Sequence, residues 1–215
     1  MNRYFPIYVD LRDKVTVVIG AGAIAERRAR HLIDSGAKVR VIAPAYTAAF
    51  EAWVNTGEIE LWRKEYSIED LKDALLVVAA TDSRYINAQI THDAKGKGLL
   101  VNNVSEADEG DVIIPTTVRR GDLCISIATG GNNPALSMRL AGEIERRFSP
   151  HYGKFVDLLG EMREHIRVEV HEALRRNAQR SLLDAEAELL ELLEADNSEG
   201  ASQRAKEIVA MVTKG

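Results

Sequence analysis

The stretch VTVVIGAGAIAERRARHLIDSGAKVRVIAP, residues 15–44, decides the fold class. It holds two continuous apolar runs, and such runs are typical of strands buried on both faces, as in parallel sheets. Between the runs, apolar residues recur at helical spacing, and Gly36 is placed to end the helix. The face that this helix is expected to bury comprises Ile24, Ala29, Leu32 and Ile33. The stretch therefore predicts a strand, a helix and a second, parallel strand.

The same alternation continues toward the C-terminus. ALLVVAAT (74–81) and GLLVNNV (98–104) are typical of two more buried strands, and the segment 83–98 between them has a helical pattern. Strands that alternate with helices form right-handed βαβ units. The sequence therefore predicts an α/β protein with a Rossmann-like doubly wound parallel sheet over residues 1–114.

A small α+β region is expected at 115–148. Two β-rich segments flank Arg120-Gly121-Asp122, which favours a hairpin turn, and a helix follows with Pro134 in its first turn. A hairpin and one helix are too small to bury a core alone. Residues 115–148 are therefore predicted to be a dimerisation region that packs against a second copy of itself.

Residues 149–215 show no strand pattern and are predicted to form a helical domain. Apolar residues at three- and four-residue spacing from Phe155 to Leu174 indicate a first helix. Ser181 is expected to cap a second helix, and the segment 197–200 to separate it from a short third one. Most of the chain's net charge of −5 lies in this part, as is usual for the solvated faces of amphipathic helices.

Composition excludes several classes of protein. With 46% hydrophobic residues the chain has material for a core, and with one cysteine it has neither a disulfide framework nor a four-cysteine zinc site. The acidic balance argues against a nucleic-acid partner. The sequence shows no signal-peptide pattern and no apolar run long enough to cross a bilayer. We expect a cytoplasmic protein with no membrane partner.

The first strand runs directly into Gly20-Ala21-Gly22-Ala23-Ile24-Ala25, which has the GxGxxA form of a dinucleotide-binding pattern. Gly20 permits a tight turn, and Gly22 lets the backbone approach a pyrophosphate. The following helix start offers free N–H groups to an anion. The pattern alone is weak, but its place between a strand and a helix supports a dinucleotide site.

One part of the dinucleotide pattern is missing. The acid that binds the adenosine ribose should end the second strand, which instead ends in Ala43-Pro44-Ala45. The choice between NAD and NADP therefore stays open on this rule. Thr81 and Asp82 follow the next strand, at the edge where open α/β sheets bind ligands. Asp82 is equally suited to cap the next helix, and the two roles are compatible.

Several longer motifs resemble one family. FPIYVDLRDKVTVVIGAGAIAERRARHLIDSGAKVRVIAP, LLVVAATDSRYINAQI, the segment from VNNVSEADEGDVIIP to MRLAGEIE, and PHYGKFVDLLGEMRE occur in the order and spacing of the precorrin-2 dehydrogenase/sirohydrochlorin ferrochelatase family, the N-terminal part of siroheme synthases. The resemblance covers residues 4 to about 167. It implies an NAD-binding domain, a dimerisation region, a helical domain and a homodimer. It also implies that precorrin-2, an anionic tetrapyrrole, is oxidised to sirohydrochlorin with NAD as hydride acceptor, and that some members insert ferrous iron.

The resemblance also implies site residues. Asn102 and Pro115 would bracket a loop that faces the tetrapyrrole, and Thr129, Gly130 and Gly131 would offer backbone N–H groups to its carboxylates. Cations should border such a substrate, with Arg119, Arg120 and Arg139 as candidates, although exposed arginine is common without any such role. The five histidines have no metal-ligand spacing, so metal ligands stay unknown. The cofactor would be lined by Gly20, Gly22, Ala23, Ile24, Pro44, Ala45, Thr81 and Asp82.

The chain departs from the family at position 105. The family has an aspartate three residues after the asparagine, and that aspartate serves both reactions, whereas this chain has Ser105. A serine hydroxyl is a poor base without a partner, so we interpret Glu106 as the catalytic carboxylate, and Ser105 and Asp111 are the other catalytic candidates in the same loop. The opposite interpretation, that these acids are merely solvated, stays open. The alternative function is a catalytically impaired module that binds NAD and tetrapyrrole.

Overall fold

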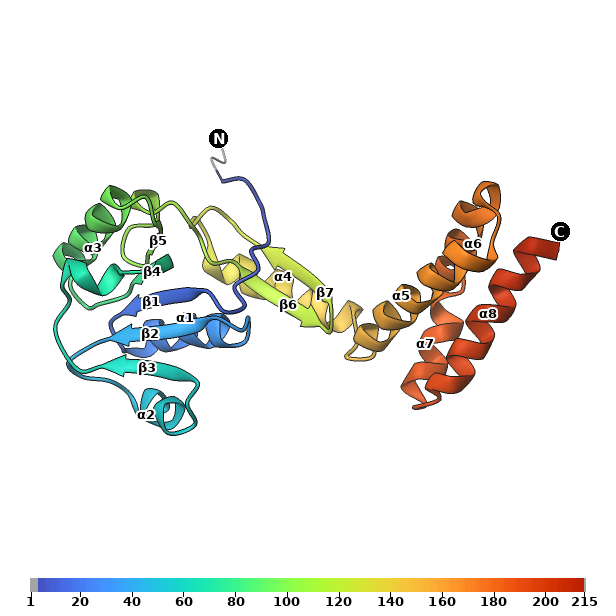
Figure 1. The fold of residues 1–215 in the computed structure, drawn as a ribbon, viewed down its shortest axis with the longest axis horizontal. Helices are drawn as coiled ribbons and strands as arrows, with labels where there is room; N and C mark the ends of the chain where they lie inside the picture. Colours follow the sequence, from blue (N-terminus) through green and yellow to red (C-terminus); the bar gives the residue numbers. More distant parts are fainter. Residues whose placement is uncertain (1–3, 215) are drawn as a thin grey trace. The chain divides into compact units, whose positions relative to one another are not determined.

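The computed structural model describes residues 4–214, which divide into two compact units (Figure 1). The first unit extends to Ile114 and includes Gly130–Asn132. The second comprises Pro115–Thr129 and the chain from Asn133 onward. The finer division into domains at 1–114, 115–148 and 149–215 stays a prediction.

The first unit is built on a sheet that has five strands in the described range, ordered β3-β2-β1-β4-β5. All neighbouring strands are parallel, and β1 lies between β2 and β4, so the direction of winding reverses on its two sides. The doubly wound α/β fold is therefore confirmed. The strands are β1 (Val15–Ile19), β2 (Lys38–Ile42), β3 (Ile59–Trp62), β4 (Ala74–Ala79) and β5 (Leu100–Asn103).

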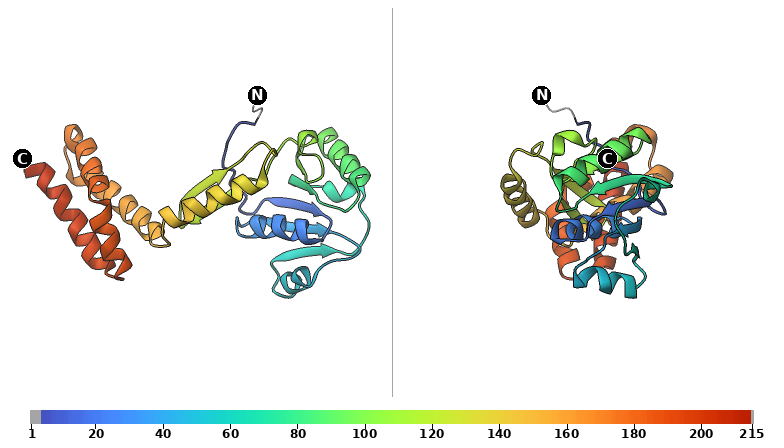
Figure 2. Two further views of the ribbon diagram at one scale, coloured as in Figure 1. Left: turned by 180° about the vertical axis from the view of Figure 1, so that it is seen from behind. Right: turned by 90° about the vertical axis from the view of Figure 1, so that its left-hand side faces the viewer.

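Helices cover both faces of this sheet (Figure 2). On one face, α1 (Ala23–Ile33) and α2 (Ala48–Asn55) pack against a core that includes Val18, Val41 and Val78. On the other face, α3 (Arg84–Gly96) and the short 3-10 helix η1 (Ile68–Leu71) pack against a core with Val17, Val77 and Val101. Successive residues of a strand thus point to opposite faces of the sheet. Because helices cover both faces, the strands are apolar at nearly every position.

The buried face of α1 agrees with the expectation only in part. Ala25, Ala29 and Leu32 are buried, whereas Ile24 is 46% exposed. Ile24 lies in the first turn of α1, whereas Ile33, at the other end of the helix, is partly buried against the same core. Gly36 ends this connection as expected, because its φ of +74° is available to glycine at little cost.

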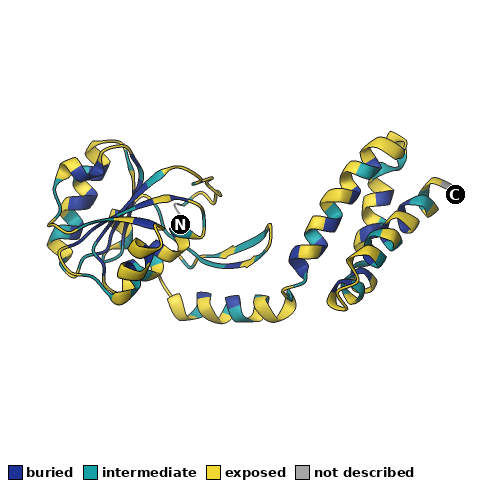
Figure 3. Cartoon of the chain, turned by 60° about the horizontal axis from the view of Figure 1, so that its bottom comes forward, coloured by how far each residue is buried: buried dark blue, intermediate teal, exposed yellow. Residues whose placement is uncertain are grey.

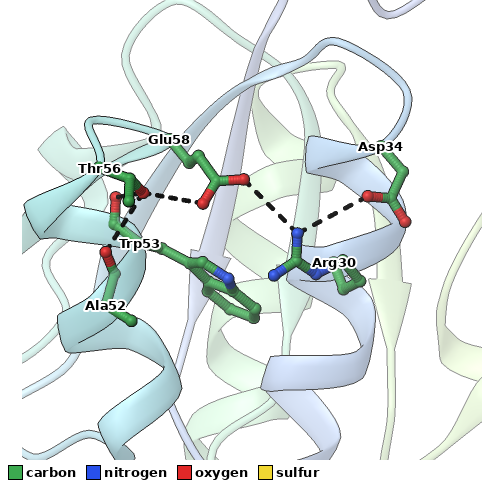
Figure 4. A network of polar contacts seen from close by, with 6 residues as sticks. All are labelled: Arg30, Asp34, Ala52, Trp53, Thr56 and Glu58. Carbon is green, nitrogen blue, oxygen red and sulfur yellow. Dashed lines mark hydrogen bonds and ion pairs between the residues drawn. The ribbon is translucent and has the colours of Figure 1, made fainter.

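A polar network fixes α1 against α2 and β3 (Figure 4). The Arg30 guanidinium lies 4.6 Å from the centre of the Trp53 ring, and its Nη1 is 3.5 Å from Glu58 and 3.8 Å from Asp34. Thr56 Oγ1 donates to Glu58 at 2.8 Å. Arg30 lies in the last turn of α1, so the network holds the C-terminal end of this helix against the end of α2 and the residue that precedes β3.

The sequence patterns did not indicate α2 or β3. The strand β3 has four residues, IELW, and forms the edge of the sheet beside β2. Its short run carries a charged residue and lacks the continuous apolar pattern of the central strands. Edge position explains that departure, because one side of the strand meets solvent.

The second unit begins with the expected hairpin, formed by β6 (Thr116–Arg120) and β7 (Leu123–Ile127). Gly121 takes a positive φ of +55° in the turn. The helix α4 (Pro134–Arg147) follows with Pro134 in its first turn and Asn133 accepting a bond from Leu136 N. Most of α4 is exposed, and it buries Ser137 and Ala141 (Figure 3). The dimerisation role of this region stays a prediction.

Four helices complete the described chain: α5 (Tyr152–Glu169), α6 (Glu172–Asp184), α7 (Glu186–Glu194) and α8 (Ser198–Lys214). The expectation of three helices was wrong in two ways. The first ends at Val170, and His171 Nδ1 accepts from Ala173 N at the start of α6, so Ser181 lies inside a helix instead of capping one. The last helix is long, with 17 residues, and starts directly after Asn197.

These helices share an apolar core, so the expected helical region is confirmed. Its largest members include Phe155, Ile166, Leu182 and Leu189, all nearly inaccessible to solvent. None of the helices within residues 4–214 is both long and apolar enough to cross a membrane.

Candidate functional site

The carboxyl ends of β1 and β4 meet at Gly20. This glycine has a φ of +101°, and a β-carbon on it would lie 2.3 Å from the carbonyl oxygen of Ala80. The turn after β1 therefore packs directly against the backbone that leaves β4. In doubly wound sheets ligands bind at this reversal of winding, outside the strand ends.

The start of α1 is open to a ligand. Gly22, Ala23 and Ile24 are exposed, and a β-carbon on Gly22 would meet nothing within 4 Å. Gly22 is the N-cap of α1, and no side chain caps the helix there. Backbone N–H groups of the first turn therefore remain available to an anion, and the space over Gly22 fits the pyrophosphate of a dinucleotide.

The end of β2 carries no acid, as the sequence requires. Pro44 and Ala45 are exposed, and Thr47 Oγ1 donates to Glu26 Oε2 at 2.7 Å, which ties the loop after β2 to α1. Arg63 follows β3, and its guanidinium lies 4.9 Å from the centre of the Tyr46 ring. An aromatic ring and a cation thus lie near the turn after β2, where the adenosine of a dinucleotide is expected, and the Ala43-Pro44-Ala45 turn has no carboxylate.

The loops that leave β4 and β5 are joined by one buried amide. Asn87, on α3, accepts from Thr81 N at 3.0 Å and from Thr81 Oγ1 at 2.7 Å. Its Nδ2 donates to Thr81 O at 3.0 Å and to Ser105 Oγ at 2.7 Å. Sequence reasoning did not identify Asn87, because nothing in a helical pattern distinguishes a buried polar clamp from a surface asparagine.

Asp82 does not cap α3, so that expectation was wrong. The cap is Ser83, whose Oγ accepts from Ile86 N at 3.4 Å. Asp82 is exposed, at the same edge as Thr81. Its other expected role, beside the cofactor, stays a prediction.

Two consecutive asparagines shape the loop after β5. Asn102 is buried, and its Nδ2 donates to Val112 O at 2.8 Å. Asn103 Oδ1 accepts from the backbone N–H groups of Ser105 and Glu106, at 2.9 and 3.1 Å. Asn102 therefore fixes the end of the loop at Val112. Asn103 fixes its beginning, at Ser105 and Glu106.

Both candidate carboxylates of this loop are paired with cations. Glu106 Oε1 is 3.0 Å from Arg84 Nη1, and Asp111 Oδ1 is 3.5 Å from Lys95 Nζ. Glu106 and Asp111 are exposed, and the hydrogen bond to Asn87 belongs to Ser105. Ser105 is thus connected through Asn87 to Thr81, which follows β4, whereas the Glu106 carboxylate is paired with Arg84.

The glycine pair after the hairpin lies near this loop, within the first unit. A β-carbon on Gly131 would be 3.7 Å from Ala107 Cβ, and Gly130 and Gly131 both have positive φ. Tyr4 Oη donates to Ala107 O at 3.0 Å, so the N-terminal segment also contacts the loop. Sequence reasoning missed Tyr4.

The candidate substrate residues of the second unit have contacts of their own. Thr129 Oγ1 accepts from Asn133 N at the start of α4. Arg120 donates to the carbonyl groups of Phe148 and Glu145 at the end of α4, which is a structural role. Arg139 is 3.7 Å from Glu143 on the same helix, and Arg119 is exposed on β6. Their contact with a substrate stays a prediction, as does that of Pro115.

Within residues 4–214, no three histidine, cysteine or acidic side chains are grouped so that they could hold a metal ion.

The sheet order, the glycine turn and the open start of α1 define a dinucleotide-binding protein. Residues 7–116 match the family described as "Putative NAD(P)-binding". Siroheme synthase 2 of Yersinia pseudotuberculosis serotype O:1b (strain IP 31758) is 34% identical over 164 residues, which are 76% of this chain and 35% of that protein. Siroheme synthase 2 of Cronobacter sakazakii (strain ATCC BAA-894) is 31% identical over the same length, 36% of that protein.

Among solved structures, "SirC, precorrin-2 dehydrogenase" matches with a TM-score of 0.74 and 25% identity, covering 95% of this chain and 100% of that one. The chain spans about a third of the length of the siroheme synthases it matches. It belongs to this "Putative NAD(P)-binding" family, and its fold is similar to that of the precorrin-2 dehydrogenase SirC.

Proposed function

We propose that this chain oxidises precorrin-2 to sirohydrochlorin with NAD as hydride acceptor. The observation that carries the proposal is the junction of two loops. The loop after β4, against which Gly20 packs, is joined at Thr81 through Asn87 to the loop after β5, which in the family faces the tetrapyrrole. The likeness to a precorrin-2 dehydrogenase over nearly the whole chain supports it. The cytoplasmic location stays a prediction.

The chain's own residues have two tasks in this reaction. The first turn of α1 binds the pyrophosphate, while Thr81 and the loop after β5 border the reacting end. A bound nicotinamide supplies the hydride acceptor. Oxidation also releases a proton from the ring, and we propose that the Glu106 carboxylate accepts it. Glu106 would have to leave its ion pair with Arg84 in order to contact the substrate. Both side chains are exposed enough to move.

The partners follow from the same proposal. The substrate is a tetrapyrrole with several carboxylates, and the protein acts as a homodimer. Insertion of ferrous iron, as a substrate, is a second proposed activity, supported by the exposed acids of the loop after β5, which would accept the protons of the pyrrole nitrogens.

The test is turnover of purified protein with precorrin-2 and NAD, followed by the appearance of NADH and sirohydrochlorin. We expect Glu106→Gln to lower kcat by about 100-fold, the usual contribution of a general base, and Asp111→Asn to stay within about twofold. Unchanged turnover in Glu106→Gln would contradict the role of Glu106. Binding of both ligands without turnover would favour the impaired binding module.

Two further arms refine the assay. Ferrous ion added after the oxidation tests metal insertion by the loss of the sirohydrochlorin spectrum in excess of a protein-free control. NADP offered in place of NAD tests the adenosine end, where the turn after β2 has no carboxylate to repel a 2′-phosphate.

A further inference from the structure

The amide of Asn87 has no freedom in its orientation. The side chain is fully buried, and Thr81 N, which can only donate, lies 3.0 Å from Oδ1. If the amide were turned over, its NH2 group would face that N–H, and a buried donor would face a donor. Oδ1 is therefore the atom that faces Thr81 N, and Nδ2 must face the other two partners.

This orientation decides what Ser105 does with its hydroxyl. Nδ2 can only donate, so Ser105 Oγ accepts the bond at 2.7 Å. The hydroxyl keeps its own hydrogen, and among the described residues no protein atom accepts it. Ser105 is partly exposed and follows β5 at the carboxyl edge of the sheet, so a bound molecule could accept this hydrogen.

We propose that Ser105 is a ligand-binding hydrogen-bond donor, oriented by Asn87, and that it is directed at an oxygen acceptor of a bound ligand. The inference rests on the proposed function for the identity of the ligands. Two oxygens are suitable: a carboxylate of the tetrapyrrole and the carboxamide carbonyl of the nicotinamide. A hydroxyl that already accepts one bond and whose hydrogen is directed outward is a poor proton acceptor, so Ser105 is not the base.

Asn87 is then a positioning residue. It acts on the ligand through Ser105, and it also holds the backbone of Thr81 by two bonds. Replacing Asn87 by aspartate keeps an acceptor for Thr81 N but removes the donor toward Ser105 Oγ and toward Thr81 O. The Ser105 hydroxyl would then donate to the new carboxylate, so it could no longer donate to the ligand.

Binding titrations test the proposal without relying on turnover. NAD and sirohydrochlorin are titrated separately into the full chain, with fluorescence and absorbance as readouts. We expect Ser105→Ala to weaken one of the two ligands about tenfold, the effect of one hydrogen bond, while Ser105→Thr, which keeps a hydroxyl, retains most of the affinity. Weaker NAD identifies the carboxamide as the acceptor, and weaker sirohydrochlorin identifies a carboxylate.

A double-mutant cycle tests the role of Asn87. Asn87→Asp should weaken the same ligand at least as much as Ser105→Ala, and its effect in the Ser105→Ala background should be clearly smaller than in the unaltered chain. Ser83→Ala, which removes the cap of the same helix, is the matched control and should leave both affinities unchanged. Thermal unfolding of each variant shows whether Asn87→Asp folds, and if it does not, the comparison of Ser105→Ala with Ser105→Thr still decides.

If Ser105→Ala binds each ligand as tightly as the unaltered chain does, Ser105 is not a hydrogen-bond donor to either ligand. If the unaltered chain binds a ligand but does not oxidise precorrin-2, the proposed function fails while the titrations still judge Ser105. If it binds neither ligand, both proposals fail.

Discussion

Two glycines of one motif have opposite structural surroundings. A β-carbon on Gly20 would collide with the backbone of Ala80 at 2.3 Å, and the φ of Gly20 is unfavourable for other residues. A β-carbon on Gly22 would meet no protein atom within 4 Å. Gly20 is therefore required by the fold, whereas Gly22 leaves space that the fold does not use.

This contrast predicts different effects of substitution. Gly20→Ala should destabilise the chain by roughly 2 kcal/mol or more, because a backbone atom must move. Gly22→Val should leave the unfolding transition nearly unchanged and weaken NAD binding at least about tenfold, because the side chain fills the space over the helix start. Chemical denaturation and NAD titration of both variants measure this. A Gly22→Val protein that binds NAD normally would show that the pyrophosphate lies elsewhere.

At the scale of elements, a hydrogen bond joins α3 to the segment before η1. Tyr66 Oη donates to Asp93 at 3.0 Å. Partial burial and the neighbouring carboxylate raise the pKa of Tyr66 above its ordinary value of 10.0. The pKa of Tyr66 is higher in the folded chain than in the unfolded chain. The bond therefore stabilises the fold at neutral pH, and this stabilisation decreases as the pH rises above the pKa of tyrosine in the unfolded chain.

We therefore expect Tyr66→Phe to lower the free energy of unfolding by about 1 kcal/mol at about pH 8, the net value of one such bond. The difference between the two proteins should shrink above about pH 10.5, where tyrosine ionises in the unfolded chain. Urea unfolding at both pH values checks this. A difference that grows with pH would contradict the assignment.

At the scale of the whole molecule, the hairpin and α4 bury few residues of their own. Val118 and Ala141 are buried there, while Met138 on α4 is 61% exposed. Together with the expected homodimer, this predicts that a second copy covers α4. The measured mass in solution should be twice the 23.8 kDa of one chain.

A charged side chain on α4, in the predicted interface, should weaken the dimer. We expect Met138→Glu to weaken the dimer at least about tenfold, since a buried unpaired charge is costly. Met211→Glu is the matched control, because Met211 on α8 is 62% exposed and lies outside the predicted interface. Analytical ultracentrifugation over a dilution series distinguishes the two. A mass of one chain for the unaltered protein would contradict the prediction.

The sequence by itself determined the central sheet, the glycine turn and the hairpin. Each of these depends on short contiguous segments: the first two strands and the glycine turn between them lie within residues 15–44, and the hairpin lies within residues 116–127. Short or irregular elements escaped the same reasoning. The edge strand β3 has four residues, and the break between α5 and α6 at Val170 keeps the apolar spacing of a continuous helix.

Only the tertiary structure decided which polar groups meet at the site. Asn87 and Ser105 are 18 residues apart, and their contact depends on α3 returning over the sheet and on β5 pairing with β4. Glu106 and Asp111 are indistinguishable in sequence from free loop acids, yet each lies beside a cation from α3. Hydrogen-bond partners follow from the register of parallel strands and the packing of helices, and no local pattern encodes these.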